Sequence, residues 1–182
     1  MRDGLLVLGL IIGGFFLIIL QEFIPPLAFL SGARLNLIPI VFCFGALLVP
    51  FPWMLVLTVG LGLMVDLATV QVVGDSAEIA LGWSVIFYLL IGLICQGLRP
   101  LVLRGHWELY ILMSALTSIL YPALQFAMIT LRRMEEGGLY YSDVVTWRIL
   151  GPGMVTLFLA PIFWFAVTLS IGPLLRMRDR EV

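Results

Sequence analysis

The chain contains no lysine, one histidine and two cysteines, and charged residues make up only 12% of it. Soluble domains usually carry about 25% charged and about 45–50% apolar residues. Here 62% of the residues are hydrophobic and the mean hydropathy is +1.15. This composition excludes an ordinary soluble domain and indicates an integral membrane protein. With a net charge of −1, the chain also offers no basic patch that could neutralise phosphates, so we expect no nucleic-acid partner.

The scarcity of reactive side chains also excludes the common catalytic sites. HExxH, GxSxG and a glycine-rich phosphate loop ending in lysine are all absent. His106 and Glu108 flank Trp107 in the stretch RGHWE, and we interpret all three as interfacial because tryptophan prefers the headgroup level. Cys43 and Cys95 lie inside apolar runs, which predicts buried free thiols. We therefore expect no enzymatic activity, no catalytic residue, no metal site and no cofactor.

Six apolar runs are predicted to form membrane helices. A helix needs roughly 20 residues to cross a hydrocarbon core of about 30 Å. We predict an all-α integral membrane protein with about six transmembrane helices in one bundle, forming a single polytopic membrane domain over residues 1–182. The first run is expected to stay in the mature chain, because no small-residue cleavage site follows it. The predicted spans are 4–24, 35–50, 53–73, 79–98, 109–131 and 146–174. The second of them would rise only about 24 Å.

The distribution of arginines predicts the orientation, because cytoplasmic loops carry an excess of basic residues. With the N-terminus inside, six arginines fall on the cytoplasmic side and four on the outer side. The cytoplasmic set is Arg2, Arg99, Arg104, Arg176, Arg178 and Arg180, and the outer set is Arg34, Arg132, Arg133 and Arg148. We therefore expect a multi-pass protein with both termini cytoplasmic.

Asp66 is the one acidic residue well inside a predicted span. If the span continues to Gly74, the carboxylate lies about 12 Å from the outer end of the helix, too deep to reach the headgroups. It must then face protein or water. Thr58, Gly62 and Thr69 share its helix face at spacings of three or four residues, and Gly62 would let a neighbouring backbone approach closely.

The fifth predicted span carries a second polar stripe, which we expect to supply the partner of Asp66. Two interpretations stay open for the pair of stripes. Either they line a polar cavity that binds a small ligand or moves an ion, or they hydrogen-bond between helices as packing groups. A pathway usually needs more than one intramembrane charge, which favours packing. The residues of the second stripe are Ser114, Thr117, Ser118, Tyr121 and Gln125.

A group of aromatic residues and arginine lies in and just after the longest polar connection, RRMEEGGLYYSD. Its members are Tyr140, Tyr141, Trp147 and Arg148. Aromatic residues and arginine are enriched at binding hot spots, but aromatic residues also form belts at the membrane surface. The four residues are therefore candidates for partner binding, with the belt as the alternative.

Several stretches of the chain carry a resemblance to a known family. They are RLNLIPIVFCFGALLVPFP, GLGLMVDLATVQVVG, DSAEIAL, a run ending in LRP, and HWE. Together they resemble the rod shape-determining protein MreD family, in which a glycine-rich third helix ends in Gly-Leu-x-x-Asp-Leu. The matching residues here are Gly62, Leu63, Asp66 and Leu67. The chain departs from the family pattern at Leu35, where many members have proline, and at Val73, where leucine is usual.

The resemblance implies a non-enzymatic scaffold of the bacterial rod (elongation) complex in the inner (cytoplasmic) membrane. Such a scaffold supports cell-shape control and lateral peptidoglycan synthesis. The implied partners are a bitopic MreC-like protein, RodA, a penicillin-binding protein and MreB, with the lipid bilayer around them. The family is also similar in architecture to the substrate-binding components of energy-coupling-factor transporters. A vitamin-binding membrane component is therefore the alternative, and it would require a pocket of about 300 Å³ or more.

Overall fold

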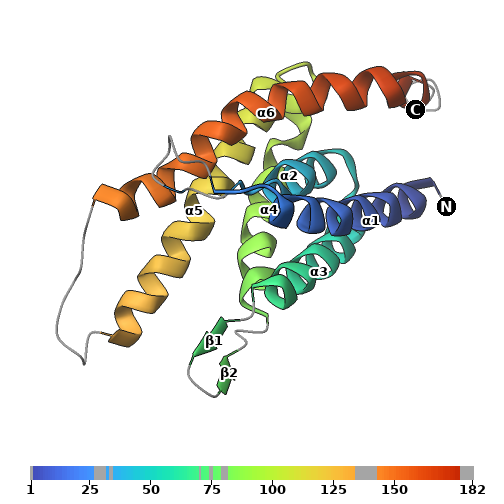
Figure 1. The fold of residues 1–182 in the computed structure, drawn as a ribbon. Coiled ribbons are helices and arrows are strands. Elements are labelled where there is room, and N and C mark those ends of the chain that lie inside the picture. Colours follow the sequence, from blue (N-terminus) through green and yellow to red (C-terminus); the bar gives the residue numbers. More distant parts are fainter. Residues whose placement is uncertain are drawn as a thin grey trace.

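In the part of the chain that it describes, a computed structural model shows six helices and one short β-hairpin (Figure 1). It describes residues 2–26, 32, 35–69, 71–73, 76–78, 82–133 and 143–176. Among these residues, five of the helices are long and apolar enough to cross a membrane. The chain is therefore a multi-pass membrane protein built as a helical bundle, as predicted. The helices are α1 (Arg2–Phe23), α2 (Ile38–Leu48), α3 (Phe51–Ala68), α4 (Trp83–Leu103), α5 (Glu108–Arg133) and α6 (Asp143–Arg176).

The helix that differs most from its predicted span is α2. It has 11 residues in place of the expected run 35–50, and it rises only about 16 Å. Pro39 lies in its first turn and Pro50 follows shortly after its last residue, so proline is placed at both ends of a short helix. All 11 residues are buried, and α2 packs against each of the other five helices. It is the central element of the bundle.

Contacts between α1 and α3 show that these two helices run in the same direction. A Cβ atom at Gly4 would lie 2.8 Å from the Trp53 ring, and one at Gly14 would meet the Leu61 side chain. Residue numbers thus increase together along both helices. Between two parallel helices the chain must run back in the opposite direction, and α2 forms part of this connecting segment. The beginning of α1 and the end of α6 lie on the same side of the molecule (Figure 1).

Two short strands separate α3 from α4, and the first of them occupies the last three residues of the predicted helix 53–73. β1 (Gln71–Val73) pairs antiparallel with β2 (Ser76–Glu78), with Val72 opposite Ala77. β-branched valines favour strands over helices, which explains why α3 ends at Ala68. The predicted depth of Asp66 is therefore wrong. Its Cα lies two residues, or about 3 Å, before the end of α3.

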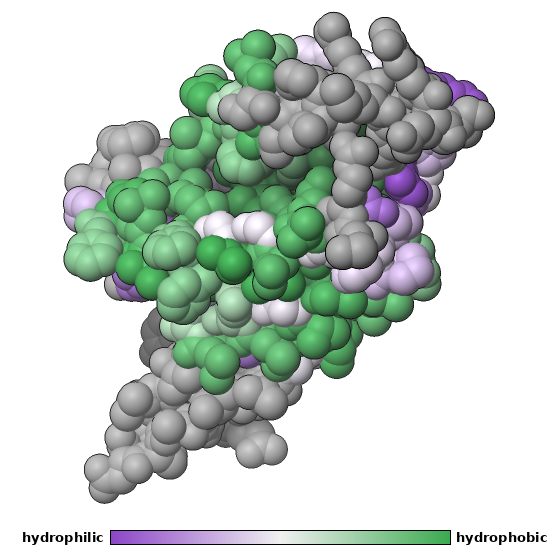
Figure 2. All heavy atoms as spheres, turned by 90° about the vertical axis from the view of Figure 1, so that its right-hand side faces the viewer, coloured by the Kyte–Doolittle hydropathy of each residue, from purple (hydrophilic) through white to green (hydrophobic). Residues whose placement is uncertain are grey.

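Large apolar side chains cover much of the molecular surface. On α1, Phe16 and Phe23 are exposed, and on α6 Phe158 and Leu169 are exposed. Most of the coloured part of the face in Figure 2 is hydrophobic, and hydrophilic residues gather toward one edge. Such surfaces are stable against lipid, because lipid tails are as apolar as these side chains.

Candidate functional site

Asp66 joins the end of α3 to the beginning of α4. Its side chain is only 5% exposed. The backbone N–H of Gly82 donates to Asp66 Oδ2 at 2.6 Å, and the N–H of Ser84 donates to Oδ1 at 3.0 Å. The first N–H groups of a helix have no partner within the helix, and the helix dipole favours a negative charge there. Asp66 thus supplies a cap that α4 does not provide for itself, since Gly82 at its N-cap has no side chain.

Gly62 brings the same two helices into close contact one turn earlier. A Cβ atom at this position would lie 2.8 Å from the Val85 Cα, which no neighbouring backbone can accommodate without shifting. The close approach predicted for Gly62 is therefore present. Gly62 and Asp66 act on the same few residues at the start of α4, so the short motif that carries the family resemblance forms one structural unit.

The expectation that α5 supplies the partner of Asp66 is wrong. In the described part of the chain, α4 packs on both α3 and α5, whereas α3 and α5 do not pack directly on each other. The link to α5 is indirect, because Ser84 Oγ lies 2.8 Å from the hydroxyl oxygen of Tyr121. A polar connection therefore runs from Asp66 through the first turn of α4 to Tyr121.

Most hydroxyl groups of the two polar stripes form hydrogen bonds to backbone carbonyls or to other hydroxyl groups of the protein. Thr58, Ser114 and Thr117 each donate to the carbonyl oxygen four residues earlier in their own helix, at 2.9, 2.8 and 2.6 Å. Between helices, Thr156 of α6 donates to Ser118 Oγ at 2.9 Å. Such bonds satisfy polar groups where no water is available. Of these four stripe residues, Ser118 bonds to another helix as the packing interpretation predicts, whereas the hydroxyl groups of Thr58, Ser114 and Thr117 donate within their own helices.

Polar side chains of neighbouring helices cap both ends of α2. At its beginning, the N–H of Leu37 donates to Gln21 Oε1 at 3.2 Å. At its end, Gln96 Nε2 donates to two carbonyl oxygens at 2.9 and 2.8 Å, and Arg99 Nη2 donates to the Leu48 oxygen at 3.2 Å. A helix that ends inside the protein needs such partners. The capping role of these residues was not predicted from the sequence, although Gln96 is a polar residue inside a predicted span.

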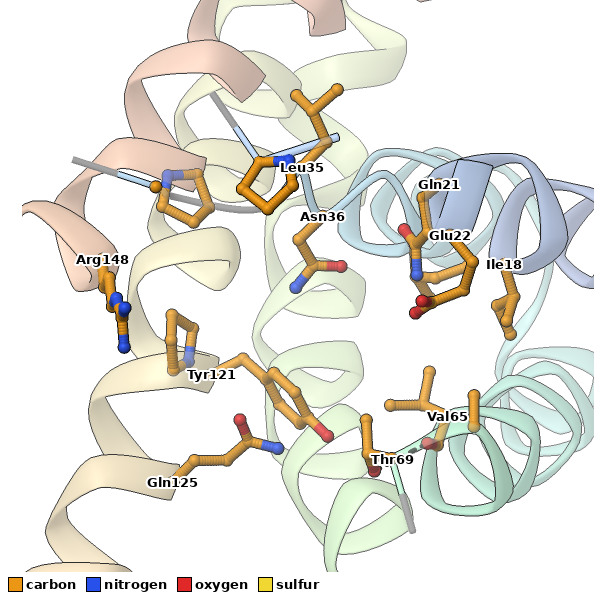
Figure 3. Close-up of a pocket in the computed structure, with 16 residues that line it drawn as sticks. Ile18, Gln21, Glu22, Leu35, Asn36, Val65, Thr69, Tyr121, Gln125 and Arg148 are labelled. Carbon is orange, nitrogen blue, oxygen red and sulfur yellow. Dashed lines mark hydrogen bonds between the residues drawn. The ribbon is translucent and has the colours of Figure 1, made fainter. Parts of the chain in front are cut away.

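A cleft of about 550 Å³ lies at the end of the bundle where α1 and α3 finish (Figure 3). Its walls come from α1, the residues before α2, the end of α3, and parts of α5 and α6. Ile18, Val65 and Pro152 are among its apolar lining. Thr69, Tyr121, Gln125 and Arg148 are the predicted site residues that line it, whereas Thr58, Gly62, Asp66, Ser114, Thr117 and Ser118 do not. The lining also includes polar residues that were not predicted, namely Gln21, Glu22 and Asn36.

The candidate partner-binding residues fall into two groups. Trp147 is 43% exposed on α6, and Arg148 beside it lines the cleft. Tyr140 and Tyr141 lie outside the described residues. The choice between a binding surface and an aromatic belt therefore stays a prediction for these tyrosines.

The described part of the chain contains no group of three or more His, Cys, Asp or Glu side chains that could hold a metal ion. Cys43 and Cys95 are buried and free, as predicted, and Cys43 Sγ lies 3.6 Å from Thr117 Oγ1. What the geometry offers is binding in the cleft and contacts between helices.

Comparison of the chain with protein-family models, with curated proteins and with solved structures found no match in any of the three. The resemblance to the MreD family and the architectural similarity to substrate-binding components of energy-coupling-factor transporters therefore stay predictions from the sequence.

Proposed function

We propose that this protein is a non-enzymatic scaffold of the rod complex in the bacterial inner membrane, with both termini cytoplasmic. One observation carries the proposal. Several buried polar groups of the described bundle are engaged in helix caps and contacts between helices, as with Asp66 on the start of α4 and Thr156 on Ser118. A bundle fixed in this way can hold partner proteins in constant positions. By its resemblance, those partners are an MreC-like bitopic protein, RodA, a penicillin-binding protein and MreB.

The family-like motif supports this proposal through its structural effect. Gly62 and Asp66 hold α4 against α3 by a close backbone contact and two hydrogen bonds. A scaffold needs its outer helix faces at fixed relative positions, because binding energy is lost whenever a partner must first order a mobile surface. The motif would provide that fixed geometry without taking part in any reaction.

The experiment is recovery of partners with the tagged, full-length protein from native membranes. We expect an MreC-like bitopic protein to co-purify, and we expect alanine at both Tyr140 and Tyr141 to reduce its recovery. Glu108→Gln is the control, because Glu108 is an exposed acid on the first turn of α5. Absence of such a partner from the wild-type preparation would disprove the scaffold proposal. If Glu108→Gln abolishes normal cell shape while the tyrosine variant recovers the partner normally, the functional surface includes Glu108 and His106 and excludes the two tyrosines.

A second candidate function is favoured by the cleft. Its volume of about 550 Å³ lies within the range of about 300–1,000 Å³ usual for small-molecule sites, and polar groups from several helices converge on it. A vitamin-binding component of a membrane transporter would use such a cleft. Mass spectrometry of small molecules extracted from the purified protein separates the two candidates, since a stoichiometric vitamin is expected only for the transporter component.

A further inference from the structure

The cleft contains hydrogen-bond donors that the protein itself does not use. Among the described residues, the side chains of Asn36 and Arg148 line the cleft and have no hydrogen bond or ion pair. A guanidinium group presents five N–H donors and no acceptor. By contrast, the Tyr121 hydroxyl is already bound to Ser84. Arg148 is the cationic donor among these described lining residues.

The two charged residues of the described lining lie on opposite walls. Arg148 extends from α6 beside α5, and Glu22 extends from α1 across the cleft (Figure 3). Asn36 projects into the space between them, and Ile18 lies on the far side of Glu22 from Arg148 in this view. Pro122 is also part of the lining. The cleft is therefore polarised, with a cation on one wall, an acid on the opposite wall, and both polar and apolar side chains in the rest of the lining.

We propose that this cleft binds a small amphipathic molecule whose carboxylate or phosphate group is held by Arg148. Arginine binds such groups through paired N–H···O bonds, and the Asn36 amide can donate a further bond. The apolar body of the ligand packs on apolar lining groups such as Pro122. The volume suits a ligand of ordinary small-molecule size. The same chemistry is present in a water-soluble organic anion and in an anionic phospholipid.

This inference deepens the second candidate function and rests on its cleft, but it does not depend on the scaffold proposal. The test uses the full-length protein in an uncharged detergent. 1-Naphthyl phosphate represents the water-soluble source, with neutral 1-naphthol as its matched probe. Phosphatidylglycerol added to the micelles represents the lipid source, and native mass spectrometry counts the lipids retained. Calorimetry measures the affinity of each soluble probe.

We expect saturable binding of the phosphate probe, of the anionic lipid, or of both, and at least tenfold weaker binding in Arg148→Gln. Asn36→Ala should weaken binding to a smaller extent. Arg104→Gln is the charge-matched control, because Arg104 is exposed and lies outside the cleft lining, and it should bind like the wild type.

Three results would overturn the inference: no binding of either anion, equal binding of 1-naphthol and its phosphate, or unchanged binding in Arg148→Gln. Retention of the lipid alone identifies a lipid source, and binding of the phosphate probe alone identifies a soluble one. Recovery of an MreC-like partner is measured separately. Weak anion binding with normal partner recovery in Arg148→Gln would therefore leave the scaffold proposal intact while supporting the cleft assignment.

Discussion

Near both ends of α4, a helix end inside the bundle is capped by side chains, and the two sets of side chains have opposite character. At its N-terminal end, Asp66 accepts bonds from two backbone N–H groups of α4. Toward its C-terminal end, Gln96 and Arg99 donate bonds to the last carbonyl groups of α2 and to that of its C-cap residue, Val49. Unpaired N–H groups attract an anion and unpaired carbonyl groups attract donors or cations. In both places a helix end inside the bundle is completed by a neighbouring helix.

The two ends differ in how many residues share the task. The N-terminal end depends on one carboxylate, brought within reach by one glycine, Gly62. The carbonyl groups at the end of α2 are shared between Gln96 and Arg99, and Arg99 makes the longer bond at 3.2 Å. Buried N–H groups without a partner are also rarer in proteins than under-satisfied carbonyl groups. We therefore expect the acid-capped end to be the more sensitive of the two.

The largest effect is expected from Gly62→Leu. The new side chain would collide with the backbone of α4 at Val85, so α3 and α4 must separate and the Asp66 cap is lost with them. We expect a cost of at least about 3 kcal/mol in the free energy of unfolding, measured by titration of detergent micelles with dodecyl sulfate. Gly97→Leu is the matched control, because nothing lies within 4 Å of a Cβ there. Equal stability of the two variants would contradict the close packing at Gly62.

The next effect is expected from Asp66→Ala, which leaves two N–H groups of α4 buried without an acceptor. We expect a loss of about 2–3 kcal/mol, because bonds to charged groups are stronger than neutral ones. Asp66→Asn keeps one acceptor oxygen and should lose about half as much. Glu108→Ala, at an exposed first-turn acid of α5, should change the free energy of unfolding by less than about 0.5 kcal/mol. A loss at position 66 no greater than at position 108 would count against the cap.

A smaller effect is expected from Gln96→Leu, which removes the donor to two carbonyl groups at the end of α2. We expect a loss of about 1–2 kcal/mol in the same titration, because a neutral bond is weaker and Arg99 remains close by. Gln96→Met, which lacks the donor but keeps an unbranched chain, should behave alike. If Gln96→Leu destabilises the bundle more than Asp66→Ala, the proposed ranking of the two ends is wrong.

The smallest effect is expected from the bond that extends the Asp66 cap to α5. Ser84→Ala and Tyr121→Phe each remove one side of the 2.8 Å contact between their oxygen atoms. We expect each to cost about 1 kcal/mol. The double variant should cost little more than either one, because both changes break the same bond. Strictly additive losses would show that the two hydroxyl groups act independently.

Hydropathy predicted the helices well, and it placed Asp66 in a protein environment. It did not predict the partner of Asp66, because the cap joins residues 16 and 18 positions apart across a hairpin. The relevant sequence signal was available. VQVV followed by Gly74-Asp75 combines β-branched residues with a dipeptide typical of hairpin turns. Taking that signal into account would have ended α3 earlier and placed Asp66 next to the start of the fourth helix.

The cleft could not have been predicted from periodicity. Its polar lining comes from residues as distant in sequence as Gln21, Asn36 and Arg148, and no repeating pattern links them. Periodicity shows which residues share one helix face, but the cleft depends on how several helices end near each other. The polar stripe on the fifth helix was correctly recognised as one face, yet only Tyr121 and Gln125 of that stripe line the cleft.

The shortness of α2 has a consequence for the order in which this protein can be assembled. Its C-terminal carbonyl groups are satisfied by Gln96, a residue that lies 50 positions later in the chain than Ala46. During synthesis, α2 emerges well before the residues that complete it, so it cannot hold its final place as an independent segment. We predict that nascent chains halted before residue 96 leave α2 accessible to water-soluble thiol reagents at Cys43, and that chains extended beyond α4 protect it. Protection in the shorter chains would show that α2 is stable without its later neighbours.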